Sequence, residues 1–532
     1  MRILRPLTLG LTFFFVLASQ AAVTPLGEQM DFFGHISYVC FLARTGLIPR
    51  PGALTLPAGI EKIQKNLPSP DQGGGERYKR WSVLDSVQRG ELKRAACDPA
   101  NLQTGFSQPN YEAQHPPLYY WIISPVYSWI YHLKLDYQYW LLSLFSIMLA
   151  SLAIPAVYLT FEQVFGTRIG VLAALLTAWL PNYMPFLGRV TNDCLSFPLF
   201  SWSIYLLIRK DKTIRHLVAA LFLIAAALFT KSYALTLLPL AVLGCWDLNG
   251  SENREHTRLR TKILLTFFLV LAVAVLFFFN WKLSGHWLLL TEVRDSAQAS
   301  LLQKILGMFR LNPVWFYFNG LIRLFWWSGF WSMVSPGIYY YTPLAVFGGI
   351  AGYGLLSRSS CRDRAFWKEA FPHLVAVVSF IAGMAWHASL FEIRTASVAG
   401  AERTGNEGWY LLVIAPSIFT LLFLPIKRMG TEDWQRKLMR FLTAGVIMWN
   451  LVGRLSSFMF WSGHVRLHHF LRGMDLRDTI AAIFNSQSWN SWLSLPGVIH
   501  PVSLTSILPL IAALICSALI IKDARYANKR TN

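Results

Sequence analysis

The sequence contains few charged residues and few cysteines for its length. Only 14% of its 532 residues are Asp, Glu, Lys or Arg, whereas 54% are hydrophobic; a soluble chain carries roughly a quarter charged residues. The six cysteines form no Cys-x-x-Cys pair and no zinc-type spacing. There is also no P-loop, no Gly-x-Gly-x-x-Gly with an acidic ribose binder, no Gly-x-Ser-x-Gly and no His-Glu-x-x-His. These absences argue against soluble nucleotide chemistry and against a structural zinc site.

Apolar runs dominate the chain instead, and many exceed the ~18 residues that suggest a membrane span. With a mean hydropathy of +0.40, they predict an all-α, polytopic protein of the cell (inner) membrane. Arg2 and Arg5 precede the first run, and short basic loops alternate with the later ones. The positive-inside rule then gives about twelve spans with both termini in the cytoplasm. The net charge of +20 fits these loops and anionic lipid better than a nucleic-acid partner.

One aromatic run, Tyr119–Leu133, is predicted to lie in the membrane interface rather than to span it. Pro125 interrupts it, and Tyr and Trp fill it, as in interfacial segments. Counting it as a span would turn every later basic loop outward. The polar mass of the chain therefore falls mainly on the outer face.

These assignments divide the chain into seven parts, and Cys40 and Cys97 fall in the same outer loop, where they could pair. The first segment ends near Ser19 in a signal-peptide-like sequence, and we expect it to remain as an uncleaved anchor. The parts are a first anchor (1–23), an outer-face loop with juxtamembrane helices (24–136), membrane helices two to seven (137–281), an outer-face loop with interfacial helices (282–341), membrane helices eight to eleven (342–452), a third outer-face loop (453–503), and a last membrane helix with a basic tail (504–532).

The stretch Thr24–Pro51 follows the first span at the membrane boundary. If it is helical, Asp31 and His35 are i,i+4 neighbours and Tyr38 continues their face. A carboxylate beside an imidazole is suited to take a proton from a hydroxyl. The alternative is that Asp31 caps a short helix and His35 is a satisfied interfacial side chain.

Other ionisable residues recur at the predicted outer ends of spans, where they are functional candidates by default. Arg189 and Asp193 lie in the turn GRVTND, Lys231 interrupts a long apolar run, and Arg454 lies near the end of a late span. Snorkelling to the headgroups is the alternative for Arg454, and a polar hairpin turn is the alternative for Lys231.

Several short elements, in this order, resemble the GT-C membrane glycosyltransferases, in particular the group that transfers aminoarabinose or mannose from a polyprenyl-phosphate carrier. The resemblance covers most of the chain. Its elements are the first span followed by Asp31-Phe32-Phe33-Gly34-His35, the exit Gly46-Leu47-Ile48-Pro49, the element His115-Pro116-Pro117-Leu118-Tyr119-Tyr120, the turns Arg189–Asp193 and Thr230-Lys231, and Gly408-Trp409-Tyr410-Leu411.

The resemblance implies transfer of a hexosyl or pentosyl group from a polyprenyl-phosphate sugar to an acceptor hydroxyl on the periplasmic or extracellular face. Asp31 would be the general base, with His35 beside it. Lys231, Arg189 and His115 would stabilise the departing lipid phosphate. His115 stands where related aminoarabinose transferases carry a lysine.

Asp193 is expected to orient the acceptor or a cation. Two positions depart from the family pattern. Phe32 follows Asp31 where the family often has a second carboxylate, for which Glu28 is the candidate substitute, and Trp409 replaces the usual Arg. No metal site is predicted, since no carboxylate or cysteine completes the set of His464, His468 and His469. A divalent cation is left open.

The expected partners are a lipid-linked sugar donor, membrane lipids, and a glycan, lipid or protein acceptor. A transporter or flippase of a lipid-linked or small polar substrate is the main alternative. Transporters usually show repeated halves and helices broken near the midplane, and the sequence shows neither clearly. A non-catalytic scaffold is a third alternative, which predicts that Asp31 tolerates replacement.

Overall fold

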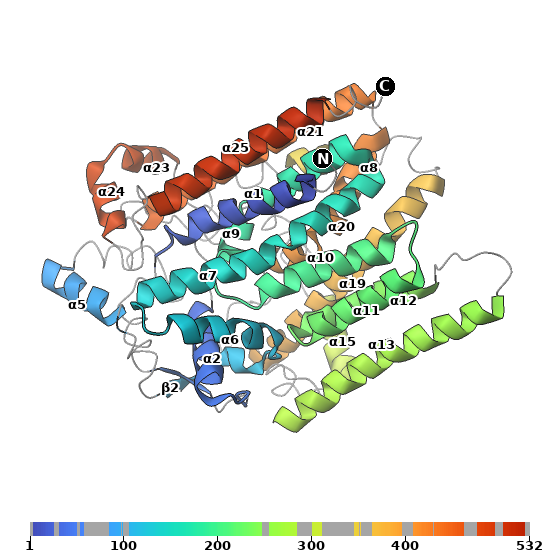
Figure 1. The fold of residues 1–532 in the computed structure, drawn as a ribbon, viewed down its shortest axis with the longest axis horizontal. Coiled ribbons are helices and arrows are strands. Elements are labelled where there is room, and N and C mark those ends of the chain that lie inside the picture. The colour runs from blue at the N-terminus through green and yellow to red at the C-terminus, as the bar shows by residue number, and fades with distance from the viewer. Residues whose placement is uncertain are drawn as a thin grey trace.

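The structure is a computed structural model dominated by long helices (Figure 1). Glu28, Cys97 and the three histidines of 464–469 lie outside the residues that it describes. The described residues are 4–25, 31–50, 54–57, 84–96, 98, 106–246, 255–284, 300–310, 345–350, 352, 364–395, 408–428, 430–461, 476–494 and 504–526.

The prediction of an α-helical, polytopic membrane protein is confirmed. Within the described residues, six helices are long and apolar enough to cross a membrane: Leu4–Ala21, Leu135–Ala178, Arg364–Leu390, Tyr410–Arg428, Glu432–Met459 and Ile507–Ala524. Shorter apolar helices cover Asp193–Ile208, Ile214–Leu228, Ser232–Trp246 and Thr266–Lys282.

The elements follow one another along the chain as α1 (Leu4–Ala21), α2 (Phe32–Thr45), β1 (Thr55–Pro57), α5 (Ser86–Ala96), β2 (Phe106–Pro109), η3 (Tyr111–Gln114), α6 (Leu118–Ile130), α7 (Leu135–Ser151), α8 (Ala153–Ala178), α9 (Tyr183–Leu187), α10 (Asp193–Ile208), α11 (Ile214–Leu228), η4 (Ser232–Leu237) and α12 (Leu238–Trp246). The second half contains α13 (Glu255–Ser284), α15 (Leu301–Arg310), α19 (Arg364–Thr395), η7 (Gly408–Ile414), α20 (Ala415–Phe423), η8 (Leu424–Arg428), α21 (Glu432–Trp461), α23 (Leu476–Ile483), α24 (Ser486–Leu493) and α25 (Leu504–Tyr526). Strands β1 and β2 pair antiparallel, with Thr55 opposite Pro109.

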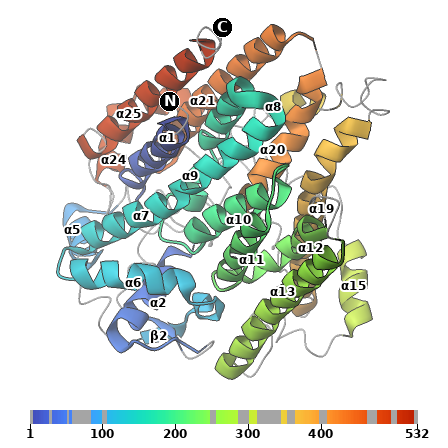
Figure 2. The ribbon, with the colours of Figure 1, turned by 45° about the vertical axis from the view of Figure 1, so that its right-hand side comes forward.

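The first and last helices lie side by side. Arg5 Nε on α1 donates to Asp523 Oδ2 on α25 at 2.6 Å. Both ends of the described chain therefore lie at one end of the bundle, and α2, α6 and β2 lie at the other, as Figures 1 and 2 agree. That the termini share a side fits the predicted topology; which compartment they face stays a prediction.

Helix α6 has the features predicted for the aromatic run after residue 118. It has 13 residues, whereas crossing the hydrocarbon core takes about 20. Trp129 on this helix is 77% exposed. Tyr120 on its buried face stacks on Tyr38 of α2, with ring centroids 3.6 Å apart. The two helices form a platform at the end of the bundle that is remote from the termini (Figure 2).

A close approach joins α2 to η3. A Cβ atom added to Gly34 would lie only 2.6 Å from Cγ of Glu112, so a larger residue would push the two elements apart. Asn110 Nδ2 donates to the Gly34 carbonyl oxygen at 2.8 Å and its Oδ1 accepts from the Glu112 backbone N–H at 2.9 Å. The absence of a side chain at Gly34 thus brings Glu112 against α2.

Candidate active site

A cavity of about 230 Å³ lies where α2, η3, η4, α19 and the loop before α10 meet. Its lining combines polar and apolar side chains. The charged or imidazole side chains are those of Asp31, His35, Glu112, His115, Arg189, Asp193, Lys231 and His387, and the large apolar or aromatic ones include those of Leu235, Phe380, Met384, Trp386 and Tyr410. All of the predicted site residues that the structure describes therefore line one cavity; their chemical roles stay predictions.

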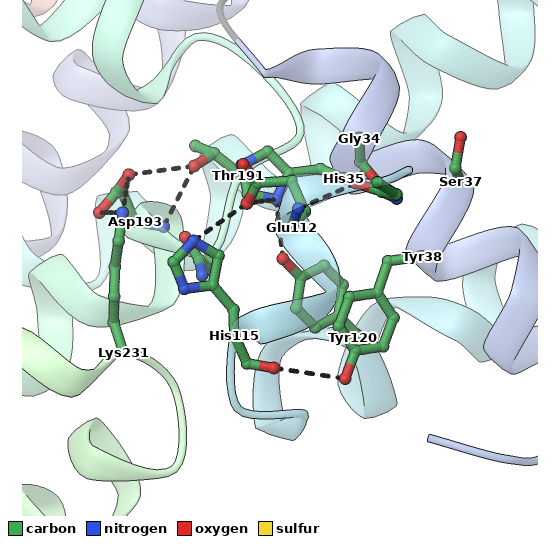
Figure 3. A network of polar contacts seen from close by, with 12 residues as sticks. Gly34, His35, Ser37, Tyr38, Glu112, His115, Tyr120, Thr191, Asp193 and Lys231 are labelled. Atoms are coloured by element: carbon green, nitrogen blue, oxygen red, sulfur yellow. Dashed lines mark hydrogen bonds and ion pairs between the residues drawn. The ribbon is translucent and has the colours of Figure 1, made fainter. Parts of the chain in front are cut away.

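Asp193 and Lys231 form a buried ion pair in this wall. Lys231 Nζ donates to both carboxylate oxygens, at 2.6 and 2.7 Å, although the residues are 38 positions apart in the chain. The Tyr233 hydroxyl donates to Asp193 Oδ1 at 2.7 Å, and the Thr191 hydroxyl donates to Oδ2 at 3.1 Å. Asp193 therefore accepts four hydrogen bonds from the protein and holds Lys231 in place (Figure 3).

Two aromatic rings also face the Lys231 ammonium. Its Nζ lies 5.2 Å from the ring centroids of both Tyr233 and Tyr410, within the range of a cation–π interaction. Burying a lysine is costly unless its charge is compensated. The carboxylate and the two rings provide that compensation at the cavity wall.

Asp31 and His35 keep the i,i+4 spacing, with Asp31 as the N-cap residue of α2. The helix begins at Phe32, Asp31 has a left-handed backbone (φ 53°, ψ 7°), and the His35 backbone N–H donates to the Asp31 carbonyl oxygen at 3.0 Å. The predicted pairing of their side chains stays a prediction. Asp31 is exposed at the cavity, whereas His35 is buried. The carboxylate beside the imidazole is Glu112, whose Oε2 lies 3.3 Å from His35 Nδ1.

Glu112 is the site residue that the sequence interpretation missed. Its Oε2 also lies 3.1 Å from His115 Nε2, so one carboxylate oxygen contacts two imidazoles, from α2 and from the segment before α6 (Figure 3). His35 Nδ1 lies 2.8 Å from the Tyr120 hydroxyl as well. The sequence did indicate this contact in one way: Glu112 lies three residues before His115, a spacing that allows contact within one turn of helix.

Burial determines the charge of His35. Removal from water lowers its pKa to about 3, and the nearby Glu112 charge only partly opposes this effect. His35 is therefore a neutral ring at neutral pH. For Glu112, burial favours the neutral acid, but its contacts with the neighbouring histidines together with the charge of Lys231 outweigh burial and lower the carboxyl pKa. Glu112 is thus a buried carboxylate.

Arg454 lies away from this cavity, in the contact between α21 and α1. It is 4% exposed and donates to Asn450 Oδ1 at 2.9 Å, to Ser19 Oγ at 2.9 Å and to the Val16 carbonyl oxygen at 2.6 Å. It does not snorkel toward the headgroups, and these contacts identify it as a packing residue.

The sequence left open whether a divalent cation binds and whether Cys40 pairs with Cys97. The described residues contain no group of three or more His, Cys, Asp or Glu side chains arranged to hold a metal ion. Cys40 is a buried free thiol.

Comparison with known proteins bears on this site. Residues 114–281 match the family described as dolichyl-phosphate-mannose-protein mannosyltransferase. The resemblance to the GT-C glycosyltransferases is confirmed. The matched segment contains His115, Arg189, Asp193 and Lys231, and it begins just after Glu112. Among curated proteins, none matches.

Two solved structures align with much of this chain at low sequence identity. One is ArnT from Cupriavidus metallidurans bound to undecaprenyl phosphate, with 13% identity, a TM-score of 0.43, and coverage of 99% of this chain and 79% of that one. The other is the oligosaccharyltransferase AglB from Archaeoglobus fulgidus with an inhibitory peptide and a dolichol-phosphate, with 13% identity, a TM-score of 0.42, and coverage of 85% and 56%.

Proposed function

We propose that this membrane protein is a glycosyltransferase that moves a sugar from a polyprenyl-phosphate carrier to an acceptor hydroxyl on the outer face of the membrane. The observation that carries the proposal is the shared cavity, in which the Asp31 carboxylate lies with the cationic side chains of Arg189 and Lys231. The family matched by residues 114–281, whose description names a dolichyl-phosphate sugar, supports the same donor class.

In this reaction Asp31 acts as the general base. A hydroxyl is a weak nucleophile, and a carboxylate within hydrogen-bond reach takes its proton as the oxygen attacks the anomeric carbon. The bond between that carbon and the phosphate oxygen breaks, and its electron pair leaves with the lipid phosphate. Arg189, Lys231 and His115 stabilise the negative charge that develops there.

The backbone at Asp31 supports a functional role. It is the only non-glycine with positive φ in the described residues, and a residue held in this conformation costs about 1–3 kcal/mol. Such strain persists where the surrounding structure fixes it, and it is concentrated at functional sites. Here it places Asp31 at the start of α2 and at the cavity.

The direct test is Asp31→Asn in membranes supplied with candidate polyprenyl-phosphate sugars. We expect sugar transfer to fall at least about a hundredfold, because the amide has no basic oxygen to accept the proton. Asp211→Asn, in an exposed pair with Arg209, is the matched control and should transfer normally. Transfer that is unchanged in Asp31→Asn would refute the base assignment. Substrate uptake into vesicles without a covalent product would identify a transporter.

The orientation of the site has its own test. Trp129→Cys on α6 should react with an impermeant thiol reagent from outside the cell, above the background of the native cysteines. Asp211→Cys, in the loop between α10 and α11, should react only after the membrane is permeabilised. The reverse pattern would place the cavity on the cytoplasmic side and overturn the proposed face.

A further inference from the structure

The cavity is lined by fewer permanent cations than carboxylates, so it lacks positive charge to bind an anionic donor. Three carboxylates line it, from Asp31, Glu112 and Asp193, against two permanent cations, Arg189 and Lys231. Lys231 already donates to both oxygens of Asp193. A phosphate entering this wall adds further negative charge, so an additional positive group is needed to offset it.

His115 is placed to supply that charge. It lines the cavity, and its Nε2 contacts Glu112 Oε2 at 3.1 Å. Its Nδ1 is buried and has no hydrogen-bond partner within the described residues. A buried polar atom without a partner is rare and points to a ligand or a functional role. In the view of Figure 3 the ring lies between Glu112 and Lys231.

We propose that Glu112 is a positioning residue for donor binding: it holds the His115 ring through Nε2 so that the ring binds the donor phosphate as an imidazolium, with Nδ1–H donating to a phosphate oxygen. This inference rests on the proposed function and extends it by one residue. With a carboxylate at one nitrogen and a phosphate at the other, both ring nitrogens face acceptors and both carry hydrogen. The imidazolium keeps its proton throughout, so the bond changes of the transfer are unaffected.

His35 has a different part in this arrangement. It is buried on α2 between Glu112 and Tyr120, and its low pKa of about 3 leaves it neutral. It therefore anchors the Glu112 carboxylate without neutralising it, and the compensating charge is left to His115. The titratable or charged groups that act on Glu112 from the surrounding elements include His35, His115, Tyr120 and Lys231.

A double-mutant cycle separates positioning from a merely structural role. We expect Glu112→Gln and His115→Gln each to lower kcat/KM for the donor roughly tenfold to a hundredfold, by analogy with outer-shell partners of histidines. The double variant should be within about threefold of either single variant, because Glu112 acts through His115. Losses that multiply, or full activity in Glu112→Gln, would overturn the proposal.

One further readout would not respond to a structural role alone. The affinity for undecaprenyl phosphate in detergent should fall about tenfold in Glu112→Gln. Unchanged affinity would refute the inference. Glu162→Gln, whose carboxylate accepts from Tyr158 and Thr167 on α8, is the control and should match the wild type.

The same experiments distinguish the two proposals. Inactive Asp31→Asn together with fully active Glu112→Gln would refute only the positioning role. Fully active Asp31→Asn would refute the proposed catalytic base whatever the cycle shows. If Glu112→Gln does not accumulate in membranes, Glu112→Asp, which keeps the charge on a shorter side chain, serves in the same cycle.

Discussion

The cavity and the contact between α1 and α21 each bury a cation, and they do so in different ways. Lys231 pairs with a carboxylate, faces two tyrosine rings and lines an open space. Arg454 donates to an amide oxygen, a hydroxyl and a carbonyl oxygen on tightly packed helices. Both residues interrupt apolar sequence in the same way. Only the surroundings separate a binding site from a packing contact, so burial of a cation is weak evidence of function by itself.

The largest effect is expected when Lys231, the buried cation at the cavity, is replaced. We expect Lys231→Met to reduce sugar transfer about a thousandfold, because the departing phosphate loses a cation. It should also destabilise the fold by about 3–5 kcal/mol, since Asp193 becomes an uncompensated buried charge. Transfer rates normalised to folded protein, together with thermal unfolding in detergent, measure the two effects.

A second substitution separates these effects. Lys231→Met combined with Asp193→Asn should recover most of the stability, because no buried charge is left without a partner, and should not recover activity. Recovery of both would mean that Lys231 has only a structural role, as Arg454 has.

Arg454→Met should have the opposite profile. Removing its three donated hydrogen bonds leaves buried acceptors on Val16, Ser19 and Asn450, at a cost of about 1–3 kcal/mol for each acceptor that stays unsatisfied. We expect a lower unfolding temperature in detergent and unchanged transfer per folded molecule. A selective loss of transfer in fully stable Arg454→Met would remove the distinction between the two cations.

Acidification should destabilise the folded protein, because the buried ring of His35 beside the cavity is neutral. The pKa of His35 is about 3 in the folded protein, where the ring is buried, and 6.5 where it is not buried. Between pH 3 and pH 6.5, therefore, the ring binds a proton only in the unfolded chain. Stability is therefore lost as pH falls below about 6.5, by roughly 2 kcal/mol between pH 7 and pH 5. Glu112, with its lowered carboxyl pKa, contributes only at lower pH.

The measurement for this prediction is thermal unfolding in detergent at pH 7 and pH 5, for the wild type and for His35→Asn. The variant should lose less stability on acidification, and taking the difference removes the contribution of the other histidines. An identical pH dependence in both proteins would contradict the burial of a neutral His35.

The smallest effect is expected at the exposed pair of Arg209 and Asp211. Although Arg209 Nε lies close to Asp211 Oδ1, the Asp211 side chain is 70% exposed, and such pairs contribute about 0–1 kcal/mol. Asp211→Asn should change stability by at most about 0.5 kcal/mol. A larger change in an unfolding experiment would show that pairs at this end are as strongly coupled as the one at the cavity.

Much of the architecture could be predicted from the sequence because it depends on local composition. Apolar runs of sufficient length predict spanning helices, and proline with aromatic residues predicted that the run after residue 118 does not span. The resemblance to GT-C enzymes also rests on short local motifs. It correctly selected His115, Arg189 and Lys231 as residues that share a cavity with Asp31.

The pairings within the cavity could not be predicted in this way. The sequence placed Asp31 near His35 but did not reveal that Glu112 is the carboxylate in contact with the imidazole. Glu112 was missed because its partner His35 lies on a distant segment. The contact forms only where Gly34 allows η3 to approach α2.

By itself, the sequence determined that the chain enters a membrane as apolar helices, and which ionisable residues it carries near their ends. These properties follow from the transfer of each segment from water to lipid, which depends on the residues of that segment alone. Only the tertiary structure decided that Lys231 meets Asp193, that Arg454 is enclosed by packing, and that Glu112 contacts two histidines. Those outcomes depend on which helix ends meet in space, because a charge is stabilised or left exposed by neighbours that the local sequence does not specify.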